Sequence, residues 1–135
     1  NLPEKTAETL RDGWLHTGDG GELDADGHLR ITDRIKDLII VGGHNISAPE
    51  VEGVLMEHPG VQDVAVVALP HPKMGEVPRA CVVIRPGASA TPEELQAFAE
   101  DRLASYKVPR RYDFMAELPR NALGKVLKRE LRERL

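Results

Sequence analysis

Hydrophobic and polar positions alternate along the chain in short blocks whose periods predict both strands and helices. Leu29 and Ile31 alternate with polar neighbours, which is the pattern of a strand with one face on a core. The apolar run 38–41 is too short for a buried helix and ends at a glycine pair, so it predicts a fully covered strand. Two β-branched runs, 61–69 and 77–84, each stop at a turn that contains proline, and we expect them to pair antiparallel.

Two stretches in the first half of the chain carry helix signals. Residues 3–10 combine an early proline with good helix formers, which predicts a short surface helix that ends near Gly13. Ser47 stands three residues before Glu50, with a proline between them. This spacing is typical of a capping box and predicts a helix over residues 48–57.

The second half of the chain contains two more helix signals and one short strand. Thr91 and Glu94 repeat the capping-box spacing ahead of apolar residues at helical intervals. A strand is expected at residues 112–115. A final amphipathic helix is marked by leucines at positions i, i+4 and i+8, namely Leu127, Leu131 and Leu135.

Glycine-rich turns separate the strands predicted near the N-terminus. A strand over 14–17 leads into residues 18–21 (GDGG), whose glycines would let the backbone approach a ligand closely; a plain turn and a ligand loop fit this stretch equally. The pair at 26–27 (DG) predicts a hairpin turn. The acidic stretch from Asp24 resembles the start of a calcium loop, but Leu29 stands where that loop requires glycine, so we expect no metal site.

Composition adds limits to this picture. With 41% hydrophobic and 30% charged residues, a chain of 135 residues can bury one modest core in one or two small units. No apolar run approaches the length of a membrane span and the N-terminus lacks a signal-peptide pattern, so a cytoplasmic location is expected. Cys81 lies in an apolar run and has no second cysteine to pair with, which favours a buried, inert thiol.

Positive charge is concentrated at one end of the chain. The formal net charge is −4, yet residues 101–135 hold ten Lys and Arg against five Asp and Glu. This excess favours an anionic partner. Nucleic acid fits poorly, because the segment lacks interleaved aromatic residues and any RNA-binding or zinc-finger motif, and a phosphorylated small molecule fits better.

Two cationic loops within this basic end have modest meaning by themselves. Residues 106–111 (YKVPRR) combine an aromatic ring with cations, but an ordinary loop with an anchoring tyrosine is favoured on composition alone. Lys125 is not the lysine of a phosphate-binding P-loop, because Pro119 replaces the first glycine of that motif and Val126 replaces its Ser or Thr. An isolated lysine of this kind would be a solvated surface residue.

Three longer motifs place these loops in a family context. They are residues 13–19 (GWLHTGD), 27–52 (GHLRITDRIKDLIIVGGHNISAPEVE) and 119–125 (PRNALGK). In their order and spacing the chain closely resembles the adenylate-forming enzymes, which comprise acyl-CoA synthetases, peptide-synthetase adenylation domains and firefly luciferase. The KREL ending and the GGHNIS turn are more similar to acyl-CoA ligases than to peptide-synthetase domains.

The resemblance implies an α+β fold, in which an antiparallel β-pair and a mixed three-stranded sheet are flanked by helices. It assigns residues 37–135 to the small, mobile C-terminal domain of such an enzyme. Residues 1–36 would be the tail of the large N-terminal domain, and Lys36 would be the hinge between the two.

The resemblance also implies roles for individual residues. Asp19 would accept hydrogen bonds from the ribose hydroxyls of ATP, and Arg34 would make a second ribose contact. Lys125 would be catalytic, because a compact ammonium at the α-phosphate offsets the charge that develops when two anions meet. The coenzyme A contacts would be Gly42, Gly43, Tyr106 and Arg110.

The reaction implied by the resemblance has two steps and several partners. A carboxylic acid, in particular a fatty acid, and MgATP would give an acyl-adenylate and pyrophosphate, and coenzyme A would then displace AMP. The phosphate loop, the Mg²⁺ ligand and the acid pocket would belong to the large domain, so the isolated chain is expected to be inactive. Two alternatives are a peptide-synthetase adenylation domain that feeds a carrier protein and a non-catalytic module that binds anions or nucleic acid.

Overall fold

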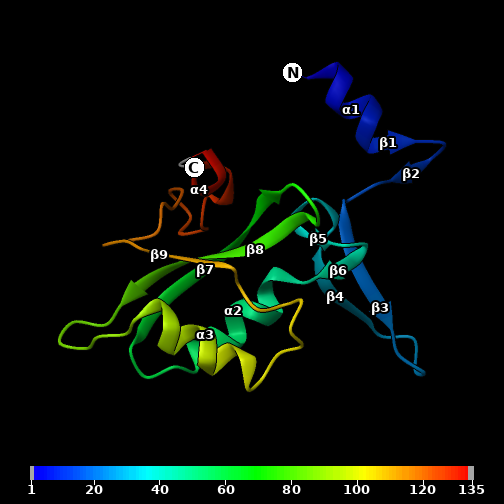
Figure 1. Cartoon of the computed structure of the whole chain (residues 1–135). Helices are drawn as coiled ribbons and strands as arrows, with labels where there is room; N and C mark the ends of the chain where they lie inside the picture. The colour runs from blue at the N-terminus through cyan, green and yellow to red at the C-terminus, as the bar shows by residue number, and fades with distance from the viewer. Residues whose placement is uncertain (1, 134–135) are drawn as a thin grey trace. The chain divides into compact units, whose positions relative to one another are not determined.

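The computed structural model describes residues 2–133, with the side chain of Lys36 left out, and its internal contacts divide the chain into two units (Figure 1). The first unit spans Asn1–Lys36 and the second Asp37–Leu135. This division coincides with the boundary expected from the sequence. The assignment of the two units to two domains of a longer enzyme stays a prediction.

The first unit consists of one helix and two hairpins. Its elements are α1 (Pro3–Thr9), β1 (Leu10–Arg11), β2 (Trp14–Leu15), β3 (Asp19–Leu23) and β4 (Leu29–Arg34). The helix ends at Thr9, earlier than expected, because the chain turns into the β1–β2 hairpin at Asp12 and Gly13, which both have positive φ. The strand expected over 14–17 is confined to its first two residues.

The core face expected for β4 is not found within this unit. Leu29 is 64% exposed and Ile31 57% exposed, and no residue of the described range 2–35 is buried. The prediction was wrong for the chain by itself, because alternation reports which face is apolar and not what covers it. The turn at 26–27 was predicted correctly, since β3 and β4 pair antiparallel across it.

The second unit contains a sheet with helices on both faces. Its elements are η1 (Ile35–Asp37, shared with the first unit), β5 (Ile39–Val41), β6 (His44–Ile46), α2 (Ala48–Met56), β7 (Val61–His71), β8 (Gly75–Ile84), α3 (Pro92–Glu100), β9 (Arg111–Phe114) and α4 (Lys128–Glu133). The long strand β8 organises this sheet. It pairs antiparallel with β7 along its length, parallel with β9, and antiparallel with β5 at Gly75. The predicted β-pair and mixed three-stranded sheet are thus present, joined into one sheet of five strands.

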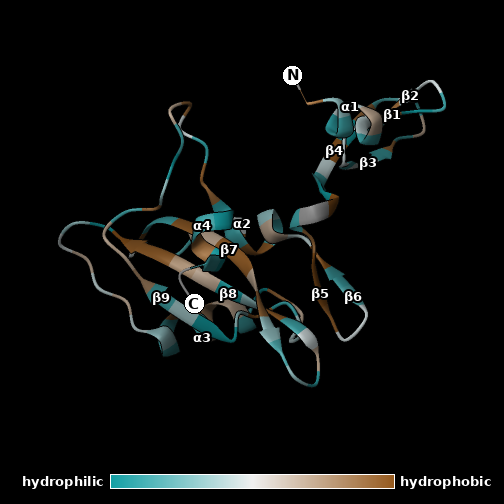
Figure 2. Cartoon of the chain, turned by 90° about the horizontal axis from the view of Figure 1, so that it is seen from above, coloured by the Kyte–Doolittle hydropathy of each residue, from teal (hydrophilic) through white to brown (hydrophobic). Residues whose placement is uncertain are grey.

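The central strands β7 and β8 are buried on both faces, and Figure 2 shows them as hydrophobic along most of their length. Their side chains alternate between two packed clusters. Val64, Val66, Ala80 and Val82 face α2 and α3, whereas Ala65, Val67, Cys81 and Val83 face Leu131 of α4. Figure 1 shows α2 and α3 on one side of the sheet and α4 on the other. The prediction of a buried Cys81 is confirmed.

The short strand β5 is covered on one face only. Ile39 and Val41 are buried, but Ile40 between them is 52% exposed, so the expectation of a fully covered strand was wrong. The reason is topological: β5 belongs to a hairpin that meets the central sheet at a single residue pair and has helices on one side only. An apolar run of four residues cannot distinguish these arrangements.

The two predicted capping boxes have different outcomes. At α3, Thr91 Oγ1 accepts from the Glu94 N–H at 3.2 Å and Glu94 accepts from the Thr91 N–H at 2.8 Å, as predicted. At α2, Ser47 has the extended backbone of an N-cap but no cap hydrogen bond from its side chain. The partner carboxylate of Glu50 is engaged elsewhere, because it binds Lys107 Nζ at 2.6 Å.

The C-terminal helix α4 is attached to the sheet by a buried arginine. Arg79 of β8 donates from Nη1 to the Leu131 carbonyl at 3.0 Å and from Nε to the carboxylate of Asp113 on β9. Leu131 is fully buried, as its place in the predicted apolar stripe requires. Leu135, the last residue of that stripe, lies outside the described residues. No helix within residues 2–133 is long and apolar enough to cross a membrane.

Candidate functional site

The predicted ribose contacts Asp19 and Arg34 lie opposite each other on β3 and β4. Arg34 Nε is 3.2 Å from Asp19 Oδ1, and neither side chain is buried. A surface hollow of about 350 Å³ beside them is lined by Thr17, Gly18, Arg34 and Ile35. Two of its lining residues are bonded to each other, because the Gly18 carbonyl accepts from the Ile35 N–H at 2.9 Å. The structure therefore pairs the Asp19 carboxylate with a cation, Arg34, that lines the hollow, and their binding role stays a prediction.

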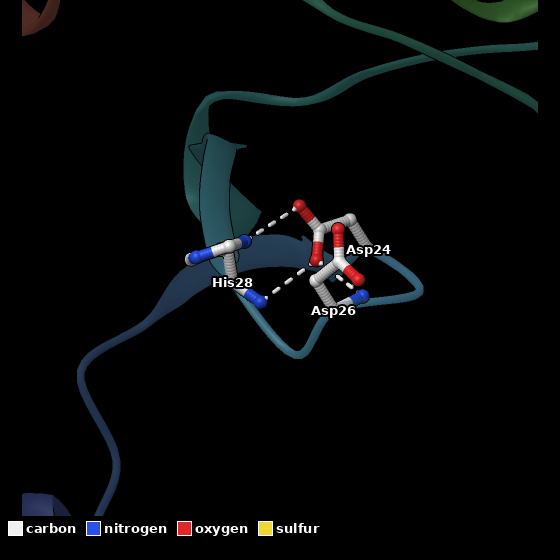
Figure 3. Close-up of side chains that lie close together, drawn as sticks. All are labelled: Asp24, Asp26 and His28. Atoms are coloured by element: carbon white, nitrogen blue, oxygen red, sulfur yellow. Dashed lines mark hydrogen bonds and ion pairs between the residues drawn. The ribbon is translucent and has the colours of Figure 1, made fainter.

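A second polar cluster in the same unit consists of Asp24, Asp26 and His28 at the β3–β4 turn (Figure 3). One oxygen of Asp24 accepts from the Asp26 N–H at 3.0 Å and the His28 N–H at 2.8 Å. Its other oxygen lies 3.1 Å from His28 Nδ1. The hydrogen bond from the His28 N–H helps to hold the pKa of Asp24 below its usual value. These contacts explain the cluster as a turn cap, and all three residues are exposed.

The glycine pair forms the two-residue turn between β5 and β6. Gly42 has φ +55° and Gly43 φ +87°, which are the torsions of a tight hairpin turn that favours glycine. A Cβ at Gly42 would lie 2.9 Å from Met74 Cε, whereas a Cβ at Gly43 would meet nothing within 4 Å. Gly42 is therefore fixed mainly by torsion, because Met74 Cε is the end of a flexible, exposed side chain that can move aside. Gly43 is fixed by torsion alone, and its surroundings are open.

Tyr106 lies beside this hairpin. Its ring is 4.8 Å from the ring of His44, the residue that follows the glycine pair, at an interplanar angle of 33°. The adjacent Lys107 fastens the loop to α2 through Glu50. Sequence reasoning grouped the glycines with Tyr106 only by resemblance and missed His44. An aromatic ring directly after a glycine turn was the signal that could have indicated it.

Arg110, the fourth predicted coenzyme A contact, is placed less tightly. Its backbone N–H donates to the Pro78 carbonyl at 2.8 Å, which holds the loop against β8. Its side chain is exposed and forms no hydrogen bond or ion pair with another described residue. The structure does not bring its guanidinium into contact with Tyr106.

Lys125 lies in a loop closed by a bridge between Arg120 and Val126. The lysine is exposed, and its ammonium forms no ion pair with any residue from 2 to 133. The neighbouring Gly124 has φ +79°, and its carbonyl accepts from Arg120 Nη1 at 2.5 Å. The structure therefore presents Lys125 as an unpaired cation on a closed loop, available to an anion from outside the described chain.

The loop of Lys125 and the glycine hairpin are anchored on different faces of the sheet. Val126 and Leu118, which flank the lysine loop, pack in the cluster beneath α4. The hairpin strands and the Tyr106 loop pack in the cluster beneath α2 and α3, through Ile39, Val41 and Val108. The segments that carry the predicted catalytic lysine and the predicted coenzyme A contacts thus pack on opposite faces of one sheet.

Comparison with known proteins identifies the family. Residues 50–125 match the AMP-binding enzyme C-terminal domain, which covers more than half of the chain. The chain belongs to this family, and its α+β fold is that of the C-terminal domain of adenylate-forming enzymes.

Several relatives match nearly the whole chain. A fatty acid–[acyl-carrier-protein] ligase of Streptomyces coeruleorubidus is 52% identical over 98% of this chain and 26% of its own length. A long-chain-fatty-acid–CoA ligase of Bacillus subtilis is 53% identical over 98% of this chain and 24% of its own length. Among solved structures, ATP-bound MatB from Rhodopseudomonas palustris has a TM-score of 0.91 and 39% identity, and the match covers 99% of this chain and 27% of MatB. The chain thus spans about a quarter of the relatives it matches.

Proposed function

We propose that this chain is the C-terminal part of an AMP-forming acyl-CoA synthetase that activates a carboxylic acid, in particular a fatty acid. The observation that carries the proposal is identity above 50% to two fatty-acid ligases over 98% of the chain. The remaining three-quarters of such an enzyme would supply the phosphate loop, the acid pocket and the residues that hold Mg²⁺. We assign no residue of this chain to that metal.

The first step would take place with Lys125 directed at the reacting phosphate. A carboxylate oxygen of the acid attacks the α-phosphorus of ATP, the bond to the β-phosphate breaks, and pyrophosphate leaves. Lys125 suits this step because its ammonium is exposed and has no competing carboxylate among the described residues. A cation lowers the barrier when it interacts more strongly with the charge of the transition state than with that of the ground state.

Asp19 would bind the ribose of the same nucleotide. An ionised carboxylate offers about four acceptor sites, so Asp19 can pair with the Arg34 guanidinium and still accept from two ribose hydroxyls. Arg34, held across the hairpin from Asp19, would fix the orientation of that carboxylate and contact the ribose itself. The neighbouring hollow of about 350 Å³ gives the sugar a place to lie against the backbone of Gly18.

The second step would use the other face of the small domain. The coenzyme A thiolate attacks the acyl carbon, AMP leaves with the electron pair of the broken C–O bond, and the thiol proton passes to solvent. The open surroundings of Gly43 would leave room for the pantetheine chain, with Tyr106 and Arg110 toward the nucleotide end. A rotation about Lys36 would exchange the two faces, as hinged domains do.

A specific observation favours one alternative acceptor. The relative from Streptomyces coeruleorubidus transfers to an acyl-carrier protein, and its identity to this chain equals that of the coenzyme A ligase within one per cent. Both acceptors end in a pantetheine thiol, so the glycine hairpin would serve either of them. A carrier protein would make no use of a nucleotide contact at Tyr106.

The experiment that tests the proposal uses the complete ligase that contains this chain. The enzyme is incubated with ATP and a panel of carboxylic acids, and AMP formation is measured with coenzyme A and with acyl-carrier protein. The proposal expects acid-dependent AMP release and an acyl-CoA product. AMP release with the carrier protein but not with coenzyme A would show that the acceptor is a carrier protein. The absence of acid-dependent AMP release across the whole panel would contradict the proposed function.

A further inference from the structure

The loop that carries Lys125 is held by polar contacts and not by apolar packing. All side chains of residues 121–125 are exposed, and Leu123 reaches 92%. A lysine has a long, flexible side chain, and a loop without core contacts gives its backbone no fixed position by itself. Other constraints must hold Lys125 if its ammonium is to meet a reacting group within the narrow tolerance of catalysis.

Asn121 supplies these constraints. Its side-chain Oδ1 accepts from the N–H of Leu123 at 3.0 Å and from the N–H of Lys125 at 2.9 Å. Its backbone N–H donates to the Lys125 carbonyl at 2.9 Å, and its carbonyl accepts from the Gly124 N–H at 2.9 Å. Both backbone polar groups of Lys125 are therefore bonded to Asn121, across four residues of loop.

Arg120 connects this small structure to the sheet. Its Nη1 donates to the Gly124 carbonyl at 2.5 Å, and its Nη2 donates to the Asp63 carboxylate on β7. The backbone bridge between Arg120 and Val126 closes the loop at its base. The position of Lys125 is thus defined relative to β7 through the sequence of contacts Asp63, Arg120, Gly124 and Asn121.

We propose that Asn121 is the positioning residue of Lys125, and that its amide oxygen sets where the ammonium stands during adenylate formation. The inference rests on the proposed function, in which Lys125 acts in the first step only. Because the loop is exposed, water can replace the two hydrogen bonds that Oδ1 accepts. Removing that oxygen should therefore displace Lys125 but leave the free energy of unfolding nearly unchanged.

The test compares Asn121→Ala with Asn121→Thr in the complete ligase, and measures pyrophosphate release and the conversion of supplied acyl-adenylate to thioester separately. Asn121→Ala should lower kcat for pyrophosphate release about 10- to 100-fold, the scale expected for a misplaced catalytic group. KM for ATP, the thioester step and the melting temperature should stay near wild type. Asn121→Thr keeps an acceptor oxygen near the loop without adding a charge beside Lys125, and should recover part of the lost rate. Ala122→Ser, one residue along and without a side-chain hydrogen bond, is the matched control.

A double mutant shows whether Asn121 acts through Lys125. If it does, adding Asn121→Ala to Lys125→Ala should cause no further loss, because the group being positioned is already absent. Fully additive losses, equal loss in both half-reactions, or a wild-type rate for Asn121→Ala would overturn the proposal. The Lys125→Ala variant by itself tests the proposed function. If it left pyrophosphate release unchanged, the catalytic role of Lys125 would be wrong, whereas a loss in Lys125→Ala without a loss in Asn121→Ala would contradict only the positioning role of Asn121.

Discussion

Gly42 and Gly43 form one turn, yet their surroundings assign them different constraints. A side chain at Gly42 meets Met74, whereas a side chain at Gly43 extends into open space at positive φ. Substitution at Gly43 therefore carries a torsional cost of about 1–2 kcal/mol without a clash inside the domain. Any effect on the reaction beyond that cost must come from something that approaches from outside.

This difference gives a prediction for Gly43→Leu in the complete ligase. The leucine should obstruct the approach of coenzyme A and slow thioester formation, while acyl-adenylate formation continues near the wild-type rate. Gly43→Ala is the matched control, because it has the same torsional cost without the bulk. The two half-reactions and a melting curve are measured for both variants. If both variants slowed both steps and melted at the same lowered temperature, Gly43 would be only a turn residue.

Some site residues could be paired from the sequence and others could not. The hairpin turn at 26–27 brings the strand ends that carry Asp19 and Arg34 near each other, but its register alone would set Asp19 opposite Asp33. A bulge between Gly20 and Gly21 shifts the pairing by one residue, so that Arg34 lies opposite Asp19. The contact between His44 and Tyr106 joins residues from a hairpin and a loop far apart in the chain. It depends on how the loop packs against α2 and the hairpin, through the Lys107–Glu50 ion pair and Val108, which no local pattern records.

At the scale of elements, the two predicted helix caps provide a controlled comparison. Thr91 accepts a cap hydrogen bond at α3, whereas the Ser47 side chain accepts none at α2. Thr91→Ala should therefore lower the free energy of unfolding by roughly 1 kcal/mol, and Ser47→Ala by clearly less. Denaturant unfolding of each variant measures this difference. Equal losses would mean that Ser47 caps its helix in solution.

The attachment of β9 and α4 predicts a dependence on pH. Burial of Asp113 favours its neutral form, but hydrogen bonds from Arg79 and Arg111 outweigh burial and hold the pKa below the ordinary value of 3.8. A carboxylate with a lowered pKa stabilises the fold fully above the unfolded value of 3.8. That contribution is lost as the pH falls through the still lower pKa of the folded state.

Asp113→Asn tests this dependence. The variant should be less stable than wild type at neutral pH, and the difference in unfolding free energy should shrink as the pH is lowered below 3.8. Asp101→Asn is a suitable control, because Asp101 lies in the same unit, is exposed and has no ion pair among the described residues. A difference that did not change with pH would exclude the carboxylate charge as its cause.

The elements show where sequence patterns stop being informative. Helix α3 and the pairing of β7 with β8 followed directly from capping and β-branched runs, because these signals are local. The half-exposed β5 and the exposed β4 did not, because burial depends on what lies against a strand. The Ser47 cap failed for a similar reason, since a distant lysine competes for its partner Glu50.

At the scale of the whole molecule, the second unit is a sheet with two separate packed faces, and each face supports a different predicted site. The alternation of β7 and β8 side chains separates the two clusters. An enzyme that needs a lysine in one step and a surface for a pantetheine thiol in the next could use both faces of such a domain by rotating it. The lysine motif at 119–125 and the glycine pair at 42–43 can be recognised in the sequence, but only the sheet topology shows that they pack on opposite faces.

Lys125→Ala in the complete ligase tests this account most directly. Pyrophosphate release from acid and ATP is measured beside thioester formation from supplied acyl-adenylate and coenzyme A. The account predicts that the first rate falls by roughly 10²–10³-fold, as loss of one charge-stabilising group at a transition state does, while the second stays near wild type. Equal losses in both half-reactions, or a loss confined to thioester formation, would contradict the assignment of the two steps to two faces of the domain.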